Sequence, residues 1–365
     1  MTPSSATAHL LAILAQPALA ADLRLPEWSR LVAVARSVNL LGALAEGLHA
    51  CGVRAPAPAA RHLEGVRQLG QRQQLSVAWE AQCLRAALGG LGAPVVLLKG
   101  AAYVLGYPEI ARGRLFGDID ILVPHALLGN VESQLMLGGW ASAKSDAYDQ
   151  RYYREWMHEL PPMVNIKRGT VLDVHHTILP LTARNSPDPA SIIDRAVPVN
   201  GFPELRVPCP EDLLIHSVTH LMHEGELRNG LRDLHDIDRM VRLFSAQDDF
   251  WPRLATIAAG NDLALPVARG LSLARRILGT PVPDAVPARL APGIERLAST
   301  RVLEQIFVSA LHSPHAAKRC WSARVAHGFI YLRGHWLRMR PARLTHHLAI
   351  KAWKAAIGAN PILFR

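Results

Sequence analysis

The most informative stretch of this chain is Gly117-Asp118-Ile119-Asp120-Ile121-Leu122-Val123. Two carboxylates alternate in it with apolar, mostly β-branched residues, and such alternation predicts a half-buried β-strand. Because side chains two positions apart on a strand share a face, we expect Asp118 and Asp120 to lie side by side, roughly 6–7 Å apart. Two like charges held so close require a compensating cation or a proton. Mg²⁺ binds carboxylate oxygens and keeps positions open for phosphate, so the stretch predicts a metal site for phosphoryl-group chemistry.

A second informative segment lies upstream, over residues 94–102 (PVVLLKGAA). A short apolar run ends in Lys99-Gly100 and enters a helix-forming stretch, which predicts a strand, a tight turn and a helix. A glycine at the turn lets backbone N–H groups approach a phosphate, and the start of a helix favours anions. Lys99 is expected to add a mobile positive charge. The alternative for Lys99 is a side chain that snorkels at the strand end.

Two more charged residues flank the carboxylate pair along the chain. Arg114 is a second candidate for phosphate contact, and its alternative role is a structural ion pair with Asp118 or Asp120. Downstream, residues 170–175 (TVLDVH) predict another alternating strand, which carries Asp173. We expect Asp173 to be either a third metal ligand or the base that takes a proton from an attacking hydroxyl.

Histidines stand close to these strands in the sequence. His158 and His175 flank the carboxylate strands, and His175 shares a strand face with Asp173. We therefore expect His175 to orient substrate or to hydrogen-bond a carboxylate. His176 points to the opposite face and is expected to be structural.

Two other groups fall on predicted helices. Three histidines share one helical stripe, and we expect them to line the cleft or pack, because no Cys cluster completes a zinc site: His216, His220 and His223. Asp236 and Asp238 imitate the Asp-x-Asp motif. They sit in a stretch of helical periodicity, however, so they do not share a face and are predicted to be solvated or capping residues.

Taken in order, these motifs resemble the nucleotidyltransferase pattern of the DNA polymerase β superfamily, and more narrowly a bacterial group of uncharacterised nucleotidyltransferases. The resemblance covers most of residues 25–240. The matching segments are Trp28 with its helix, Leu98-Lys99-Gly100, Arg114-Leu115-Phe116-Gly117-Asp118-Ile119-Asp120-Ile121-Leu122-Val123, His158, Leu172-Asp173-Val174-His175, and Pro210-Glu211-Asp212-Leu213-Leu214 before a His-rich helix near Arg232-Asp233.

The resemblance implies an enzyme that moves an NMP group from an NTP to an unidentified acceptor, with release of pyrophosphate. It implies Asp118, Asp120 and Asp173 as catalytic and metal-binding residues, with Mg²⁺ or Mn²⁺ as the cofactor. The residues implied to contact the nucleotide are Lys99, Gly100, Arg114, His158 and His175. A small molecule, a sugar and a peptide or protein are all open as acceptors. The alternatives are a catalytically silent module that binds a nucleotide or partner, and transfer of another group from a nucleotide donor.

Length and composition indicate the architecture. At 365 residues, half of them apolar and few aromatic, the chain is expected to be of the α+β class, with helices around a small mixed sheet. We expect an N-terminal helical region over 1–90, a nucleotidyltransferase core over 91–180, a helical region completing the cleft over 181–304 and a basic helical tail over 305–365. Within these regions, 138–140 predict an edge strand and 180–210 a loop that serves as a lid or acceptor-facing surface.

Charge is unevenly distributed. The net charge is +10, and the ten basic residues after Glu304, where no acid occurs, account for all of it. Aromatic residues are interleaved with them, and we expect a terminal helical layer with a cationic outer face. The alternative is a tail that contacts nucleic acid, anionic lipid or a phosphorylated partner.

Cellular context follows from other features. The cysteines are scattered without C-x-x-C spacing and predict reduced thiols: Cys51, Cys83, Cys209 and Cys320. The apolar N-terminus lacks a basic leader and predicts a packed helix. No apolar run is long enough for a membrane span. A cytoplasmic protein, peripheral to the membrane through its tail, is expected.

Overall fold

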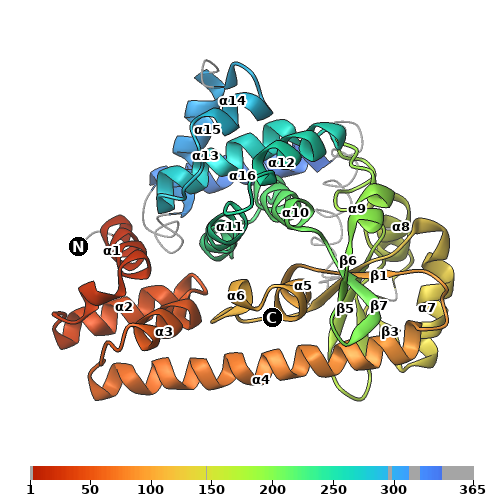
Figure 1. Ribbon diagram of the computed structural model, residues 1–365, viewed down its shortest axis with the longest axis horizontal. Coiled ribbons are helices and arrows are strands. Elements are labelled where there is room, and N and C mark those ends of the chain that lie inside the picture. The colour runs from red at the N-terminus through yellow and green to blue at the C-terminus, as the bar shows by residue number, and fades with distance from the viewer. Residues whose placement is uncertain (1–2, 145, 295–297, 312–320, 339–365) are drawn as a thin grey trace, which may run out of the picture.

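A computed structural model describes residues 3–144, 146–294, 298–311 and 321–338. Helices surround one mixed sheet in this part of the chain, as expected for the α+β class (Figure 1). The sheet has seven strands in the order β3-β4-β5-β2-β1-β7-β6. Their bounds are β1 Val95–Leu98, β2 Ile119–Leu122, β3 Trp140–Ser142, β4 Met163–Asn165, β5 Val171–His175, β6 Val197–Val199 and β7 Phe202–Val207.

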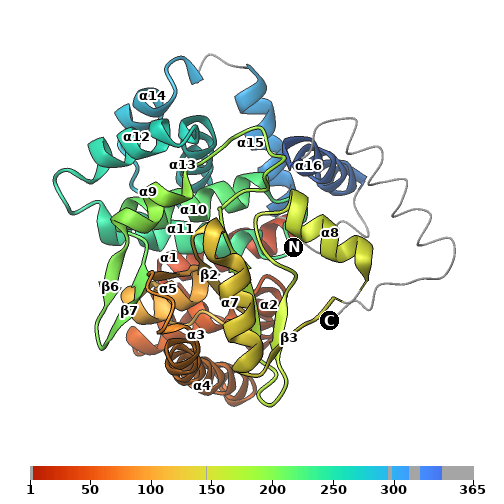
Figure 2. The ribbon, with the colours of Figure 1, turned by 90° about the vertical axis from the view of Figure 1, so that its right-hand side faces the viewer.

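The centre of the sheet is formed by the strands that the sequence predicted. β1 and β2 are antiparallel and buried throughout, and β2 is parallel to β5. The predicted edge strand is confirmed, because β3 follows Gly139, whose φ is 87°, and lies at one end of the strand order. β6 lies at the opposite edge (Figure 2).

The N-terminal helices stand at the end of α4 that lies away from the sheet (Figure 1). The predicted packed N-terminal helix is confirmed, because Leu10 and Ile13 of α1 are fully buried. α4 has 32 residues and connects this helical region to the sheet. The bounds in this region are α1 Pro3–Ala15, η1 Pro17–Ala20, α2 Leu25–Ser37, α3 Leu41–Ala50 and α4 Ala57–Leu88.

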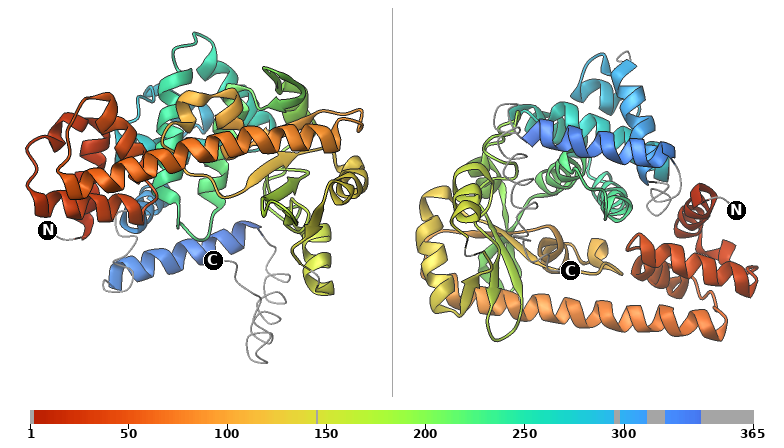
Figure 3. Two further views of the ribbon diagram at one scale, coloured as in Figure 1. Left: turned by 90° about the horizontal axis from the view of Figure 1, so that it is seen from below. Right: turned by 180° about the vertical axis from the view of Figure 1, so that it is seen from behind.

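The remaining helices cover the sheet and build the upper layer of Figure 1. α7 stands on one side of the sheet, and α5 and α10 on the other (Figures 1 and 3). The bounds are α5 Lys99–Gly106, α6 Pro108–Ala111, η2 His125–Leu127, α7 Leu128–Leu137, α8 Ala147–Trp156, α9 Pro189–Arg195, α10 Pro210–His223, α11 Gly230–Phe244, α12 Phe250–Gly260, α13 Ala264–Leu278, α14 Ala285–Leu290, α15 Ala298–Leu311 and α16 Trp321–Arg338.

The prediction of a loop over residues 180–210 is wrong. The segment contains α9 and the β6–β7 hairpin, and β7 pairs in parallel with β1. The hairpin turns at Gly201, whose φ is 77°. Pro198 lies on β6, and an edge strand is where a sheet tolerates a residue without an N–H. One of the prolines that indicated a loop therefore lies on an edge strand, and another, Pro189, begins α9.

Only part of the predicted basic tail lies within the described residues. α16 packs on α15 and α10, and its two C-terminal arginines are partly buried rather than part of a cationic outer face. Arg333 donates to the carbonyl oxygen of Met222, and Arg338 lies 3.4 Å from Glu224 Oε1. The basic residues outside the described ranges are Lys318, Arg319, Arg340, Arg343, Lys351, Lys354 and Arg365.

The structure also describes three of the four cysteines and the hydropathy of the helices. Cys51, Cys83 and Cys209 are free thiols, as predicted, and Cys320 lies outside the described residues. Among the helices that the structure describes, none combines the length and the hydropathy needed to cross a membrane.

Candidate active site

The carboxylates that the sequence singled out meet on β2 and β5. These strands are parallel neighbours, and Asp120 and Asp173 are Cα partners in their register. Asp120 is only 2% exposed, whereas Asp118 precedes β2 and is exposed at its start. Desolvation by the surrounding protein and the Asp120 carboxylate raise the pKa of Asp118. One acid just before β2, one on β2 and one on β5 thus come close enough for the charges of Asp118 and Asp120 to act on Asp173.

Lys99 provides the positive charge of the cluster. It begins α5 with a left-handed φ of 42°, and its Nζ donates to Asp120 Oδ1 at 2.7 Å. Burial lowers the pKa of Lys99, but the carboxylates of Asp120, Glu159 and Asp118 together raise it by more, so the amine stays charged. Lys99 therefore forms an ion pair with Asp120 and does not simply snorkel at the strand end.

His175 holds the same carboxylate oxygen. Its Nε2 lies 2.9 Å from Asp120 Oδ1, which confirms the prediction that His175 hydrogen-bonds a carboxylate. Burial alone would raise the pKa of Asp120, but Lys99 and His175 together keep that pKa well below its ordinary value. Asp120 is therefore an ionised carboxylate with two donors on one oxygen.

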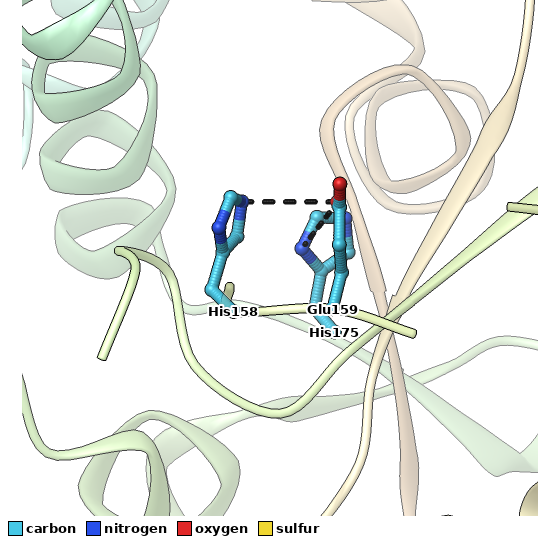
Figure 4. Close-up of side chains that lie close together, drawn as sticks. All are labelled: His158, Glu159 and His175. Carbon is cyan, nitrogen blue, oxygen red and sulfur yellow. Dashed lines mark ion pairs between the residues drawn. The ribbon is translucent and has the colours of Figure 1, made fainter. Parts of the chain in front are cut away.

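Glu159 belongs to the site and was missed by the sequence reasoning. The chain at 158–160 runs antiparallel beside β5, with a bridge between Glu159 and His175. Glu159 Oε2 lies 3.5 Å from His175 Nδ1 and 3.8 Å from His158 Nε2, and Figure 4 shows the three side chains together. The signal available in the sequence was an acid next to His158, just before a proline pair.

Asp173 is a carboxyl group of the cluster that lacks a positively charged partner in the described part of the chain. Its Oδ1 is buried and has no hydrogen-bond partner among the described residues. Burial, helped by the carboxylates of Glu159, Asp120 and Asp118, raises the pKa of Asp173 to about 8. The carboxylates outnumber the charge that Lys99 supplies, so Asp173 retains a proton near neutral pH. A divalent cation would supply the missing positive charge, and the acids therefore fit such an ion.

The closest convergence of ligand atoms involves other residues. Among the described residues, the ligand atoms of His158, Glu159 and His175 all lie within 4.8 Å of one another. Asp118, Asp120 and Asp173 do not form such a group. The aspartates form a more open arrangement around the strand ends.

Arg114 has a different partner from those considered in the sequence. Its Nε donates to Asp236 Oδ2 at 2.7 Å, and the guanidinium lies 5.2 Å from the ring centroids of Tyr103 and Phe116. Gly100 packs beside this group, because a Cβ on it would lie 2.5 Å from Phe116 Cδ1. Close packing against Phe116 and Arg114 thus accounts for a glycine at this position.

The prediction that Asp236 and Asp238 are solvated or capping residues is wrong. Both are buried in α11. Asp236 accepts a hydrogen bond from Arg114. Asp238 accepts hydrogen bonds from Thr280 Oγ1 at 2.7 Å and from Arg242 Nε at 2.9 Å. Their partners come from distant segments or from the next helical turn, so helical periodicity alone gave no sign of burial.

His216 and His220 of α10 lie near enough to Lys99 for its charge to help lower the pKa of both. Burial lowers the pKa of His216 to about 3, and Lys99 adds to this effect. His223 is buried, and its Nδ1 lies 2.9 Å from the Thr219 carbonyl oxygen, so it packs as expected. His176 is buried with its ring 4.8 Å from that of His125, which fits a structural role.

A mixed sheet with acids on neighbouring parallel strands and a lysine at the turn is an arrangement suited to phosphoryl-group transfer. A sequence model of the family described as uncharacterised nucleotidyltransferase matches residues 25–279, which is more than half of the chain. The chain belongs to this family. Membership supports a nucleotidyltransferase function, and so a transferase. No curated protein and no solved structure gives a significant match.

Proposed function

We propose that this protein is a metal-dependent nucleotidyltransferase that moves an NMP group from an NTP to an acceptor and releases pyrophosphate. In this proposal Asp118, Asp120 and Asp173 hold Mg²⁺ or Mn²⁺ together with the triphosphate. The observation that carries it is the unpartnered, proton-holding carboxyl of Asp173 beside ionised Asp120 on the parallel neighbour strand. Family membership supplies the nucleotidyl-transfer part of the proposal.

The residues of the cluster have separate tasks in this reaction. A bound divalent ion would stabilise the charge on the attacking and leaving oxygens of an in-line displacement. The Lys99 ammonium forms an ion pair with the Asp120 carboxylate, and His175 orients the same carboxylate. With a divalent ion bound, Asp173 would be ionised, and its carboxylate would take the acceptor proton or complete the ligand shell. The acceptor atom bonds to the α-phosphorus, and pyrophosphate leaves with the electron pair of the broken phosphoanhydride bond.

The remaining predicted nucleotide contacts are His158, Gly100 and Arg114. His158 stands beside Glu159 and is available to a substrate group. Gly100 and Arg114 are part of the packing next to the cluster, and Arg114 retains further N–H donors for phosphate beside its bond to Asp236. We propose action in the cytoplasm on a small molecule, a sugar or a peptide or protein, with the basic tail available to an anionic partner or membrane surface.

Asp118→Asn provides the sharpest test, because Asp118 is exposed and its loss leaves the core unchanged. NTPs labelled at the α-phosphate are incubated with cell extract and Mg²⁺, and both labelled product and pyrophosphate are measured. The expected result is transfer by the wild type and a loss of more than about 100-fold in the variant, because a ligand is removed. Asp248→Asn, an exposed aspartate on the α11–α12 connection, is the matched control. Transfer by Asp118→Asn at the wild-type rate would refute the assignment.

One observation favours a second candidate function. The Lys99 ammonium already pairs with the Asp120 carboxylate, as a bound cation would. A catalytically silent module that binds nucleotide through the same cluster is consistent with this ion pair. Calorimetric titration with ATP and Mg²⁺ separates the two functions, because binding without pyrophosphate release across many acceptors indicates the silent module.

A further inference from the structure

We propose that His158, Glu159 and His175 form a binding site for one transition-metal ion, distinct from the site of the three aspartates. Its ligands are two imidazole nitrogens and one carboxylate oxygen. The inference does not require nucleotidyl transfer, because it follows from the geometry of these three side chains.

The spacing of the ligand atoms fits a small metal ion. With Zn–N bonds of about 2.0–2.1 Å, two ligand atoms of a tetrahedral ion lie about 3.3 Å apart. Glu159 Oε2 lies 3.5 Å from His175 Nδ1 and 3.8 Å from His158 Nε2. All three ligand atoms lie within 4.8 Å of one another, so movement of the side chains has to close the remaining distance.

The backbone holds the ligands in place. Leu160 N donates to Val174 O at 2.8 Å, and His176 N donates to His158 O at 2.9 Å. These bonds bracket Glu159 and tie its segment to the end of β5, on which His175 lies. The three side chains therefore start from one continuous antiparallel pairing and need little ordering to converge on an ion.

The hydrogen bonding of His175 fixes its tautomer. Asp120 is ionised and only accepts, so His175 Nε2, 2.9 Å from Asp120 Oδ1, carries the hydrogen. In the neutral ring, Nδ1 then presents a lone pair, and it is buried with no hydrogen-bond partner in the part of the chain that the structure describes. It faces Glu159 Oε2, which is an acceptor when ionised, at 3.5 Å. A metal ion bound between these two atoms would satisfy both of them.

The same arrangement is the one that metal-binding histidines use. Such a histidine donates its second ring N–H to a carboxylate, which sets the ring orientation and makes the ligand nitrogen more basic. Here Asp120 is that carboxylate, and His175 is the link between the two sites. His158 presents its Nε2 to the same Glu159 carboxylate oxygen, at 3.8 Å.

The donor set indicates which ions fit. Imidazole nitrogens suit Zn²⁺, Co²⁺, Fe²⁺ and similar ions, whereas Mg²⁺ prefers oxygen ligands. Three protein ligands leave at least one coordination position open for water or a substrate oxygen. The chain thus combines an all-oxygen cluster for Mg²⁺ with a mixed nitrogen and oxygen site for a transition metal.

Cobalt titration of the full chain, after treatment with a chelator, tests the inference. Wild type is expected to bind one Co²⁺ with the visible absorption of a nitrogen-ligated ion. Glu159→Gln keeps the shape of the side chain and removes the charge, and its affinity should fall by at least about 10–100-fold. His49→Ala, which removes an exposed histidine of α3, is the matched control and should leave binding unchanged.

Two further variants separate the sites. His158→Ala serves if Glu159→Gln does not fold, and the same loss of affinity is expected from it. Asp118→Asn should retain the cobalt spectrum while losing nucleotidyl transfer, so that failure of one assignment is visible apart from failure of the other. The inference is overturned if wild type shows no nitrogen-ligated Co²⁺, if neither Glu159→Gln nor His158→Ala weakens binding, or if Asp118→Asn abolishes the spectrum.

Discussion

Asp120 and Asp173 are register partners on adjacent parallel strands, so two acids far apart in the sequence share one face of the sheet. Asp120 is ionised and accepts hydrogen bonds from Lys99 and His175. Asp173 keeps a proton, because burial and the neighbouring carboxylates disfavour its charged form. This asymmetry between paired acids gives a measurable pH dependence.

Asp173→Asn is predicted to become more stable relative to wild type as the pH rises in the presence of a chelator. The pKa of Asp173 is about 8 in the folded protein and about 4 in the unfolded chain, so folding favours the protonated form. The stabilising contribution of that proton is fully present below about pH 4 and is lost as the pH rises through about 8. The asparagine does not titrate and suffers no such loss.

Urea unfolding of both proteins at about pH 5 and about pH 9 measures this difference. Asp248→Asn should show no pH-dependent difference from wild type and serves as the control. A stability difference for Asp173→Asn that is the same at both pH values would show that Asp173 is not held protonated by its surroundings.

Arg114→Met is predicted to destabilise the fold by about 3–5 kcal/mol, because it leaves Asp236 buried without its partner. The double variant Arg114→Met with Asp236→Leu should recover most of this loss, since it removes both charges. A double-mutant cycle by urea unfolding gives the coupling energy. If Arg114→Met unfolds like wild type and loses only nucleotide affinity, the arginine acts on phosphate and not on the fold.

Gly100→Ala is predicted to cost about 1–3 kcal/mol of stability through overpacking. The added Cβ would lie 2.5 Å from Phe116 Cδ1 and 3.0 Å from Arg114 Nη1. Gly117→Ala is the matched control, because no atom lies within 4 Å of the Cβ position there. Phe116→Leu should relieve the clash in the double variant. Equal melting temperatures for the Gly100 and Gly117 variants would contradict a packing role for Gly100.

The sequence revealed features that are local in the chain. Alternation placed Asp118 and Asp120 at a strand, and the apolar run before Lys99 predicted β1 and the turn into α5. Side-chain alternation on β5 also paired Asp173 with His175 on one face. Each of these features follows from strand periodicity over a few residues, which tertiary contacts did not override.

Other features depend on distant pairing and carry no local signal. The Arg114–Asp236 ion pair joins residues 122 positions apart. Glu159 reaches the site only because its segment pairs with β5, and β7 joins the sheet beside β1 after a long excursion. Periodicity identifies the face of an element, but the register between elements is set by the whole fold.

Lys99→Met is predicted to destabilise the protein in a chelator and to recover in Mg²⁺ or Mn²⁺. Asp120 is almost fully buried, and loss of Lys99 leaves only His175 on its carboxylate. An uncompensated buried charge costs about 3–5 kcal/mol, and a divalent ion at the cluster would offset part of that cost. Thermal unfolding with and without the ion measures the recovery, with exposed Lys167→Met as the control.

Lys99→Gly separates charge from backbone conformation in the same experiment. It removes the same amine, but glycine accepts the left-handed φ of 42° without steric strain. It should therefore be more stable than a Lys99→Ala variant, whose Cβ strains this conformation, by about 1 kcal/mol once the entropy of glycine is considered. Both variants should respond to Mg²⁺ alike, because neither has the Lys99 ammonium that pairs with the Asp120 carboxylate. Absence of any ion-dependent recovery in the two variants would show that no divalent cation occupies the neighbourhood of Asp120.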